Sequence, residues 1–444
     1  MINTRRRTEP PLNRASDHSG PRGLPRNGAN LWALGFLLLL LAPLLGGRAA
    51  LADERELEDR IVRGTAREGL VVVDEHLARW PQDRHAQGLR NQLRVALGEF
   101  DPLLAELAAR ANANPNDPLP SLLRAALPLA AVERVEAARE AWSRAPADPD
   151  AAEAVVRALV ASGDLSAAEQ ALAATRGLLT ESRQLRLLAS LEMARGNLEA
   201  ADKALRTAST MNPDDAETQR LLAELCRRLK RWLDAERAVG RALFLAPARP
   251  ENYATAARIE YDRGRLEEAI EVGKRGLGLL PQNADLLETL TRTAIARRDL
   301  VRARQALAQL AECRDAEPQR VLALSCAVAW ETRDTDGLAR NLGQWRAQSP
   351  PPSASQTALH RGRLAYLQDD LAGLREVIQE IATHADNPNA DRVELERHAS
   401  ALADSVQRRA SRNRFITWIG ALAGAAAVAL VLATGITRRA RTRS

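Results

Sequence analysis

The chain has 444 residues and is rich in charge but poor in aromatic side chains, with 27% charged and 3% aromatic residues. Its formal net charge is +6, but residues 1–30 carry +4 and residues 408–444 carry +8, which leaves −6 for the long middle. An acidic middle is a poor platform for a phosphate backbone, so we expect no nucleic-acid partner. Three cysteines without a close pair exclude a zinc knuckle and a C-x-x-C redox motif.

The first 52 residues have the order of an export signal. Arginines in residues 1–30 precede an apolar run over residues 31–45, and the small-residue segment Ala50-Leu51-Ala52 follows it. Two interpretations stay open, a signal peptide that is cleaved here and an uncleaved N-terminal anchor. Both export the residues that follow.

From residue 53 on, a helical pattern recurs at a fixed period. Two runs of three prolines each have a spacing of 34 residues: Pro81, Pro115 and Pro149, then Pro213, Pro247 and Pro281. Proline cannot continue a helix, so each one is expected to close a unit. A period of this length is typical of stacked helix–turn–helix repeats.

The clearest unit covers residues 182–215. Its first helix is expected to carry an apolar stripe of Leu185, Leu188 and Leu191, followed by a turn at Gly196-Asn197. Two of its positions recur in phase: the turn at Gly196, Lys230 and Gly264, and a small residue on the second helix at Ala201, Ala235, Ala269 and Ala303. A third column, late in the second helix, consists of Ala208, Ala242 and Gly276.

These columns resemble the tetratricopeptide repeat (TPR) family, although Leu or Val replaces most of its aromatic residues. The resemblance is specific for residues 151–281. It implies an all-α fold, a right-handed α-solenoid of TPR-like helix–turn–helix repeats. Degenerate turns extend the array over residues 53–388, with about eight or nine units; they lie at Gly98, Arg298, Arg333 and Asp369.

The sequence carries no recognisable catalytic or cofactor motif. Its six histidines lack metal-site spacing, and no P-loop, G-x-S-x-G or G-x-G-x-x-G occurs. We therefore expect no enzyme, no cofactor and no metal site. For the cysteines, buried free thiols and a Cys313–Cys326 bridge both stay open.

The resemblance also implies that one polar face of the first helices lines a concave groove. The candidate partner-binding residues there are Arg183, Arg186, Arg220, Arg227, Arg258, Tyr261 and Arg292. Arginine forks fit carboxylates, so an acidic peptide, a chain terminus or an anionic polysaccharide are the candidate ligands. The alternative is a face that is neutralised by its own glutamates, such as Glu217 and Glu224.

The C-terminal part is expected to reach a membrane. Residues 389–414 predict a capping or stalk helix with a weak apolar stripe of Val393, Leu395, Leu402 and Val406. Residues 415–436 contain no charge and are long enough to form a transmembrane helix that contacts lipid, followed by a basic cytoplasmic tail at 437–444. Gly420 and Gly424 match a small-xxx-small pattern, which favours a homodimer through this helix.

Localisation and function follow from these parts together. Arginine far outnumbers the three lysines, and alanine is abundant, as in GC-rich bacterial genomes. We expect a single-pass inner-membrane protein with its array in the periplasm. Its expected function is that of an extracytoplasmic scaffold for protein–protein interactions in assembly of an envelope complex. The alternative is a component of envelope polysaccharide synthesis or export that binds an anionic glycan or its synthesis machinery.

Overall fold

The computed structural model describes residues 54–383 and 389–441, and the side chains of residues 389, 390 and 420–441 lie outside the described part. The predicted leader, residues 1–52, also lies outside it. All regular secondary structure in the described residues is helical.

A helix over residues 54–63 precedes the labelled ones. The others are α2 (Ala66–Arg79), α3 (Arg84–Ala96), α4 (Phe100–Ala113), α5 (Leu119–Ala125), α6 (Ala131–Arg144), α7 (Pro149–Ser162), α8 (Leu165–Ala174), α9 (Glu181–Arg195), α10 (Leu198–Met211), α11 (Ala216–Arg228), α12 (Trp232–Leu245), α13 (Pro250–Asp262), α14 (Leu266–Leu279), α15 (Ala284–Ala296), α16 (Leu300–Glu312), α17 (Pro318–Glu331), α18 (Thr335–Arg346), α19 (Ala354–Leu367), α20 (Leu371–Thr383) and α21 (Asn389–Arg441).

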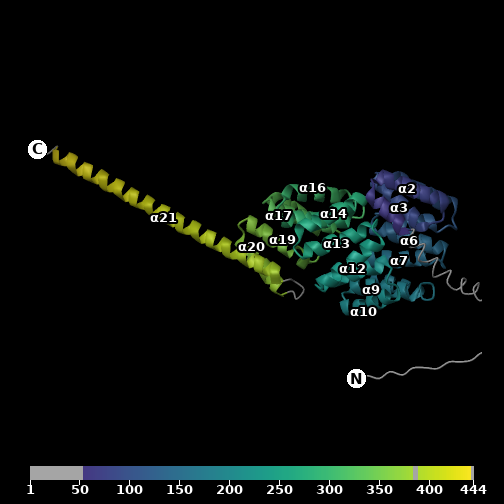
Figure 1. Ribbon diagram of the computed structural model, residues 1–444. Coiled ribbons are helices and arrows are strands. Elements are labelled where there is room, and N and C mark those ends of the chain that lie inside the picture. Colours follow the sequence, from purple (N-terminus) through teal and green to yellow (C-terminus); the bar gives the residue numbers. More distant parts are fainter. Residues whose placement is uncertain (1–53, 384–388, 442–444) are drawn as a thin grey trace, which may run out of the picture. The chain divides into compact units, whose positions relative to one another are not determined.

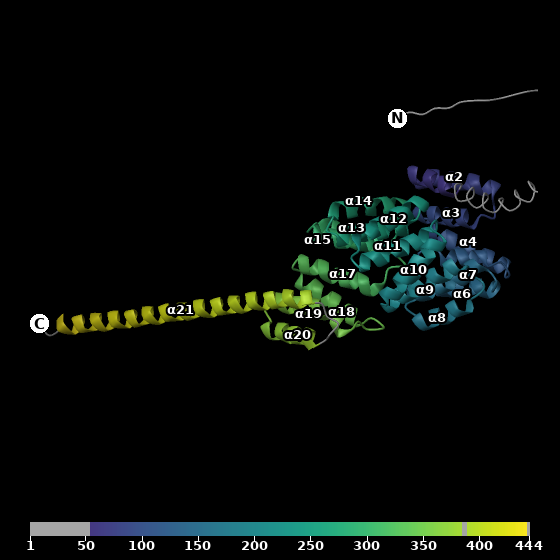
Figure 2. The same ribbon diagram turned by 60° about the horizontal axis from the view of Figure 1, so that its bottom comes forward.

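Up to residue 383, the described helices form ten successive pairs, each with a first helix, a short turn and a second helix. First helices of successive pairs contact one another, as α7 does α9 and α11 does α13, whereas successive second helices make no comparable contact in the described part. The first helices therefore form an inner layer and the second helices an outer one (Figures 1 and 2). The array has more pairs than the expected eight or nine, because a first helix as short as α5, with 7 residues, shows no periodic pattern.

Most of the turns inside a pair share one backbone conformation. Eight of these turns in the described residues hold one residue with φ between 56° and 85°: Gly98, Gly163, Gly196, Lys230, Gly264, Arg298, Arg333 and Asp369. After seven of these residues, all except Gly163, the next N–H donates to a carbonyl five residues back, as Asn197 does to Glu192 at 2.8 Å, which ends the first helix. The predicted turn positions are confirmed, including the three degenerate ones after residue 281.

The small-residue column is also confirmed. Ala201, Ala235, Ala269 and Ala303 are all fully buried, where the second helix meets its partners. In three pairs nearer the ends of the array, a leucine fills the same position and is equally buried: Leu103, Leu338 and Leu374. The small-residue column is not recognisable in the sequence of these pairs, because leucine replaces alanine. The residue at this position is buried all the same.

The predicted apolar stripe on α9 is wrong at one position. Leu188 is 37% exposed, whereas Leu187 and Leu191 are each 1% exposed and lie in the core. A first helix packs against the pairs on both sides, so its buried surface is wider than a single stripe.

One of the closing prolines has a different role from the one predicted. Pro81 and Pro115 lie in the turns that follow second helices, but Pro149 is the first residue of α7, after the N-cap Asp148. Pro146 occupies the turn instead. Proline suits the first helical position because the N–H that it lacks would have no partner in the helix.

The long helix α21 covers the last pair of the array. Leu395 and Leu402 are buried in a cluster with Leu374 of α20, whereas Val393 and Val406 are 41% and 44% exposed. Half of the predicted stripe thus packs as expected. A Cβ on Gly362 of α19 would lie 2.6 Å from the Leu395 methyl carbons, so this glycine allows the two helices to approach closely.

Candidate partner-binding face

Charged positions of the inner layer stack at the repeat spacing. One column contains Asp150, Arg183, Glu217, Glu251 and Asp285, and a second contains Glu153, Arg186 and Arg220. The sign of the charge changes along each column. A carboxylate on one first helix can therefore bind a guanidinium on the next.

Arg186 is the most buried cation of this face. Its side chain is 7% exposed and lies between Glu153, at 2.6 Å, and Asp215 of the next pair, with which it also forms an ion pair. Beside it, Arg183 reaches Asp150 at 3.0 Å. Loss of the buried Arg186 guanidinium would remove the cation that Glu153 and Asp215 share, so Arg186 links its own pair to the pairs before and after it.

Glu217 and Arg220 form a two-pronged pair within α11. Arg220 donates to the two carboxylate oxygens at 2.9 Å and 2.7 Å. Burial acts to raise the pKa of Glu217, but the charge of Arg220 outweighs it and holds that pKa well below its usual range. Arg157 and Arg249 add to this effect, so three arginines surround one carboxylate.

A second pair of this kind lies seven residues further along α11, about two helical turns away. Arg227 donates to the two oxygens of Glu224 at 2.9 Å and 2.8 Å and also pairs with Asp262 of α13. Burial acts to raise the pKa of Glu224, but hydrogen bonds from Arg227 and the charge of Arg258 lower it to about 2. Glu224 is therefore ionised at any ordinary pH.

Arg258, Tyr261 and Arg292 are held less firmly. The nearest carboxylate oxygen to Arg258 is that of Asp285, at 3.8 Å, and the buried Nε of Arg258 has no hydrogen-bond partner. Arg292 is 49% exposed and pairs only with Glu288 of its own helix, at 2.8 Å. Tyr261 is half-buried near the end of α13.

All seven predicted residues lie on first helices, and the structure adds internal partners for most of the arginines. Five of the seven bind a carboxylate of this chain within 3.0 Å: Arg183, Arg186, Arg220, Arg227 and Arg292. The face is close to neutral, as the alternative interpretation predicts. Its role in binding stays a prediction.

Two charged residues outside the columns interact electrostatically with each other. Asp315, in the turn before α17, and Arg134 of α6 each have one buried side-chain atom without a hydrogen-bond partner. Burial raises the pKa of Asp315 to about 6, although Arg134 acts in the opposite direction. The columns miss Asp315 because it lies in a closing turn, and no sequence signal links it to Arg134.

The structure decides between the two alternatives for the cysteines. Cys226, Cys313 and Cys326 are free and buried, so the bridge between the last two is absent. Across residues 54–383 and the described part of α21, no group of His, Cys, Asp or Glu side chains is placed to hold a metal ion.

Within the described residues we find no helix that combines the length and apolar character needed to cross a bilayer. From residue 420 on, the predicted span lies outside the described side chains, and so do the side-chain positions of Gly420 and Gly424.

Comparisons with known proteins identify the fold. Neither the protein-family models nor the curated proteins give a match. Among solved structures, the chain is similar to the APC/C hetero-tetramer Cut9–Hcn1, with a TM-score of 0.61 and 14% identity over 81% of this chain and 74% of that chain. It is also similar to yeast Tom70, with a TM-score of 0.40 and 11% identity over 81% of this chain and 89% of that chain. For PilW, a type IV pilus biogenesis factor, the TM-score is 0.40 at 19% identity over 48% of this chain and 98% of that chain.

These neighbours are TPR-repeat proteins, so the array has a TPR-like fold. The argument rests on the first likeness, and at this identity it concerns the fold alone. Such arrays present an extended inner surface, which suits the binding of other proteins.

Proposed function

We propose that this chain is a scaffold whose inner layer of first helices binds a segment of a partner protein. The observation that supports this is the series of charged columns, which runs through successive first helices. Arg258 and Arg292 are the groups on this face that are most free to exchange an internal partner for a carboxylate of the ligand. An anionic glycan would need more unpaired arginines than this face offers, so we favour a protein segment.

The scaffold can be tested with a photo-cross-linking amino acid at single positions of the full-length chain in its native membrane. Tyr261 on the inner layer is the test position, and Leu233, which is 60% exposed on the outer helix α12, is the control. We expect a specific cross-linked protein from position 261 and none from position 233. Equal cross-linking from both, or none from position 261, would rule out the inner face as the binding surface.

A pair of charge reversals gives an independent test. Arg258→Glu with Arg292→Glu should abolish the cross-link, because both changes place a negative charge where a partner carboxylate would bind. Arg237→Glu with Arg302→Glu is the matched control, since these arginines are 72% and 62% exposed on outer helices. Loss of the cross-link in both double variants would indicate a non-specific charge effect and contradict the proposal.

We further propose that residues 415–436 anchor the scaffold in the inner membrane, with the array in the periplasm, where it takes part in assembly of an envelope complex. The uncharged sequence supports this, and so do Phe415, Ile416 and Trp418, which are exposed by 60%, 57% and 61% where the span would begin. Alkaline phosphatase fusions after residues 400 and 444 test the topology. Activity is expected only for the first, and activity of the second alone or of both would contradict it.

A further inference from the structure

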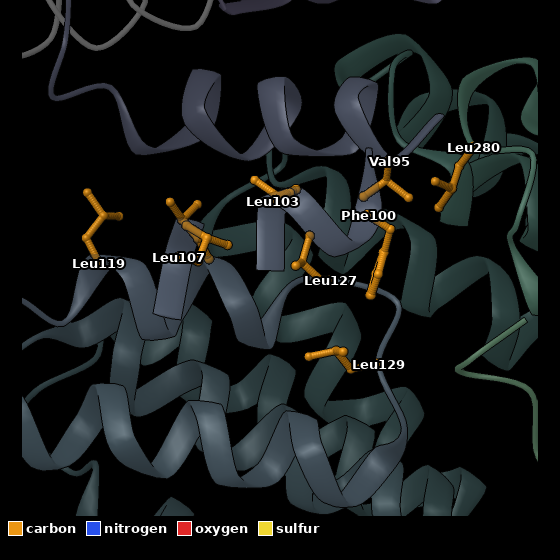
Figure 3. Packing of buried hydrophobic residues seen from close by; sticks show 9 residues of the cluster. Val95, Phe100, Leu103, Leu107, Leu119, Leu127, Leu129 and Leu280 are labelled. Atoms are coloured by element: carbon orange, nitrogen blue, oxygen red, sulfur yellow. The ribbon is translucent and has the colours of Figure 1, made fainter. Parts of the chain in front are cut away.

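The two ends of the array are covered in different ways. At the N-terminal end, the first two helix pairs pack against a later part of the chain. Glu58, which is 2% exposed, accepts a hydrogen bond from the Ala248 N–H at 2.9 Å. Leu280 is buried in a cluster with Val95 and Phe100, where the three side chains lie next to one another (Figure 3). At the C-terminal end, α21 covers the last pair and then continues beyond it.

Helix α21 runs beside α19 in the same direction. Arg363, in the second half of α19, donates to Glu394 at 2.8 Å. Just after the end of α19, Asp369 pairs with Arg409 at 2.9 Å. Both partners on α21 lie further along the chain as those on α19 do. The turn after α19 is therefore the part of this helix hairpin that lies beside the exposed stretch of α21.

Beyond these contacts, α21 is a single exposed helix. Leu402 is its last buried residue in the described part, and every side chain from residue 406 to residue 419 is exposed. No carboxylate follows Asp404 in the sequence. The exposed stretch begins with four arginines and continues with large apolar residues: Arg408, Arg409, Arg412 and Arg414, then Phe415, Ile416, Trp418 and Ile419.

The arginines surround the helix and do not form a stripe. Around the axis, Arg408, Arg409 and Arg414 lie about 100–140° from one another, because successive residues are about 100° apart. The apolar residues are distributed in the same way, since Ile416 and Trp418 lie about 160° apart. A stripe would suit a partner helix, whereas a basic ring followed by an apolar ring suits a lipid surface that the helix enters end-on.

Three of the four arginines have no carboxylate partner among the described residues. Arg408 donates to the backbone carbonyl of Asp404 at 3.3 Å, and Arg412 and Arg414 form no ion pair within that part of the chain. We call Arg408, Arg412 and Arg414 the collar. Their guanidinium groups remain available for an external oxyanion.

The remaining arginine relates the array to the level of the collar. Arg409 precedes Phe415 by six residues, a rise of about 9 Å along a helix. The polar layer on each side of a bilayer is about 5–7 Å thick. With the span beginning at Phe415, the turn after α19 therefore lies at the outer edge of the headgroups. Arg409 also neutralises Asp369 in this turn, whose charge would otherwise repel anionic lipids.

We propose that the collar binds the headgroups of anionic phospholipids and that the array rests on the bilayer at the turn after α19. This inference rests on the proposed membrane anchor, and it adds a lipid class and a fixed level of the array. Three cations without a carboxylate favour anionic over zwitterionic headgroups. The stacked rings of Phe415 and Trp418, with centroids 6.4 Å apart, lie directly after the collar, where aromatic residues meet the membrane interface.

Lipid retention tests the collar. The full-length chain is placed in nanodiscs of equal parts phosphatidylglycerol and phosphatidylcholine, and native mass spectrometry counts the lipids that stay bound. We expect a preference for phosphatidylglycerol. Arg408→Gln, Arg412→Gln and Arg414→Gln together should lower this preference by up to about fivefold for each arginine.

The matched control changes three exposed arginines on second helices to glutamine: Arg206, Arg237 and Arg302. Its lipid preference should equal that of the native chain. Millimolar inorganic phosphate should leave the lipid bound, because a free ion lacks the acyl chains. An equal loss in both triple variants, no loss in the collar variant, or displacement of phosphatidylglycerol by inorganic phosphate would overturn the collar as a lipid site.

Fluorophores at the two ends of α19 test the level of the array. The three native cysteines are buried, so a label reacts with an exposed cysteine from Gln368→Cys or from Ala354→Cys. These positions are about 21 Å apart along the helix. In vesicles that contain phosphatidylglycerol and a lipid with a spin-labelled headgroup, we expect strong quenching at position 368 and little at position 354.

Flotation of the same vesicles separates this inference from the anchor on which it rests. A chain that does not float with the vesicles lacks the anchor, and both proposals then fail. A chain that floats but is quenched equally at both positions, or at neither, contradicts the contact at the turn after α19 and leaves the anchor standing. Circular dichroism shows that each variant keeps its helical content.

Discussion

Gly276 is the position where a single methyl group gives the sharpest test of how the repeats pack. It belongs to a column with Ala208 and Ala242, both fully buried, so alanine fits this position in two other pairs. At Gly276, however, a Cβ would lie 2.7 Å from the Tyr253 Cβ and 2.7 Å from a Leu286 methyl carbon. Tyr253 Cβ is fixed to the backbone of α13, so α13 and α14 would have to move apart.

Two opposing effects set the magnitude for Gly276→Ala. Alanine in a helix interior is favoured over glycine by about 1 kcal/mol. Overpacking of a close helix contact costs about 1–3 kcal/mol. The matched control is Gly278→Ala in the same helix, where a Cβ has no neighbour within 4 Å and only the first effect operates. We expect Gly278→Ala to raise the free energy of unfolding and Gly276→Ala to lie about 1–3 kcal/mol below it.

Urea denaturation of the full-length chain, followed by circular dichroism, measures both variants. Hydrogen exchange of peptides from α13 to α15 shows whether the loss is local to this contact. An increase in stability for Gly276→Ala as large as that for Gly278→Ala would refute the reasoning. It would mean that α13 and α14 can separate at no cost.

Two further predictions concern the turns. Lys230 has φ 56°, a conformation that costs an L-residue about 1–2 kcal/mol, so Lys230→Gly should raise the urea midpoint of unfolding. Gly264 lies at the equivalent turn with φ 77°, so Gly264→Ala should lower this midpoint. Shifts of the opposite sign would contradict the backbone conformation of these turns. For Asp315, burial raises the pKa to about 6, so the folded chain binds a proton that the unfolded chain releases above about pH 4. Stability should therefore fall as pH rises through this interval, and Asp315→Asn should remove that part of the slope in midpoints measured at pH 4.5 and pH 7. An unchanged slope would show that Asp315 is more hydrated than its surroundings indicate.

The sequence predicts the local rules of this fold well. The positive-φ turns and the fully buried Ala201 column can be predicted from residue types at a fixed spacing. Each of them depends on the backbone and packing of a single helix pair. The prolines are less informative, since proline is equally suited to a closing turn and to a first helical position, and only the structure separates Pro146 from Pro149.

The candidate site is predicted only in part. The columns place Arg186 and Arg220 at equivalent positions of two first helices, but spacing alone does not show that Glu153 and Glu217 already bind them. Contacts between distant parts are not predictable from the period at all. Glu58 with Ala248 and Arg314 with Asp101 depend on the curvature summed over several pairs, which no single repeat encodes.

The contacts of the first two helix pairs with later closing turns also change how the chain should fold. In an ordinary repeat array each unit touches only its neighbours, so stability is a sum of local terms and unfolding can begin at either end. Here Glu58 and Ala248 are 190 residues apart, and Asp101 and Arg314 are 213 apart. Such contacts form late, since long loops must close first, and they tie the N-terminal end of the array to its centre. Fraying is therefore left mainly to the pairs after residue 317, and residues 54–314 should unfold as one cooperative block.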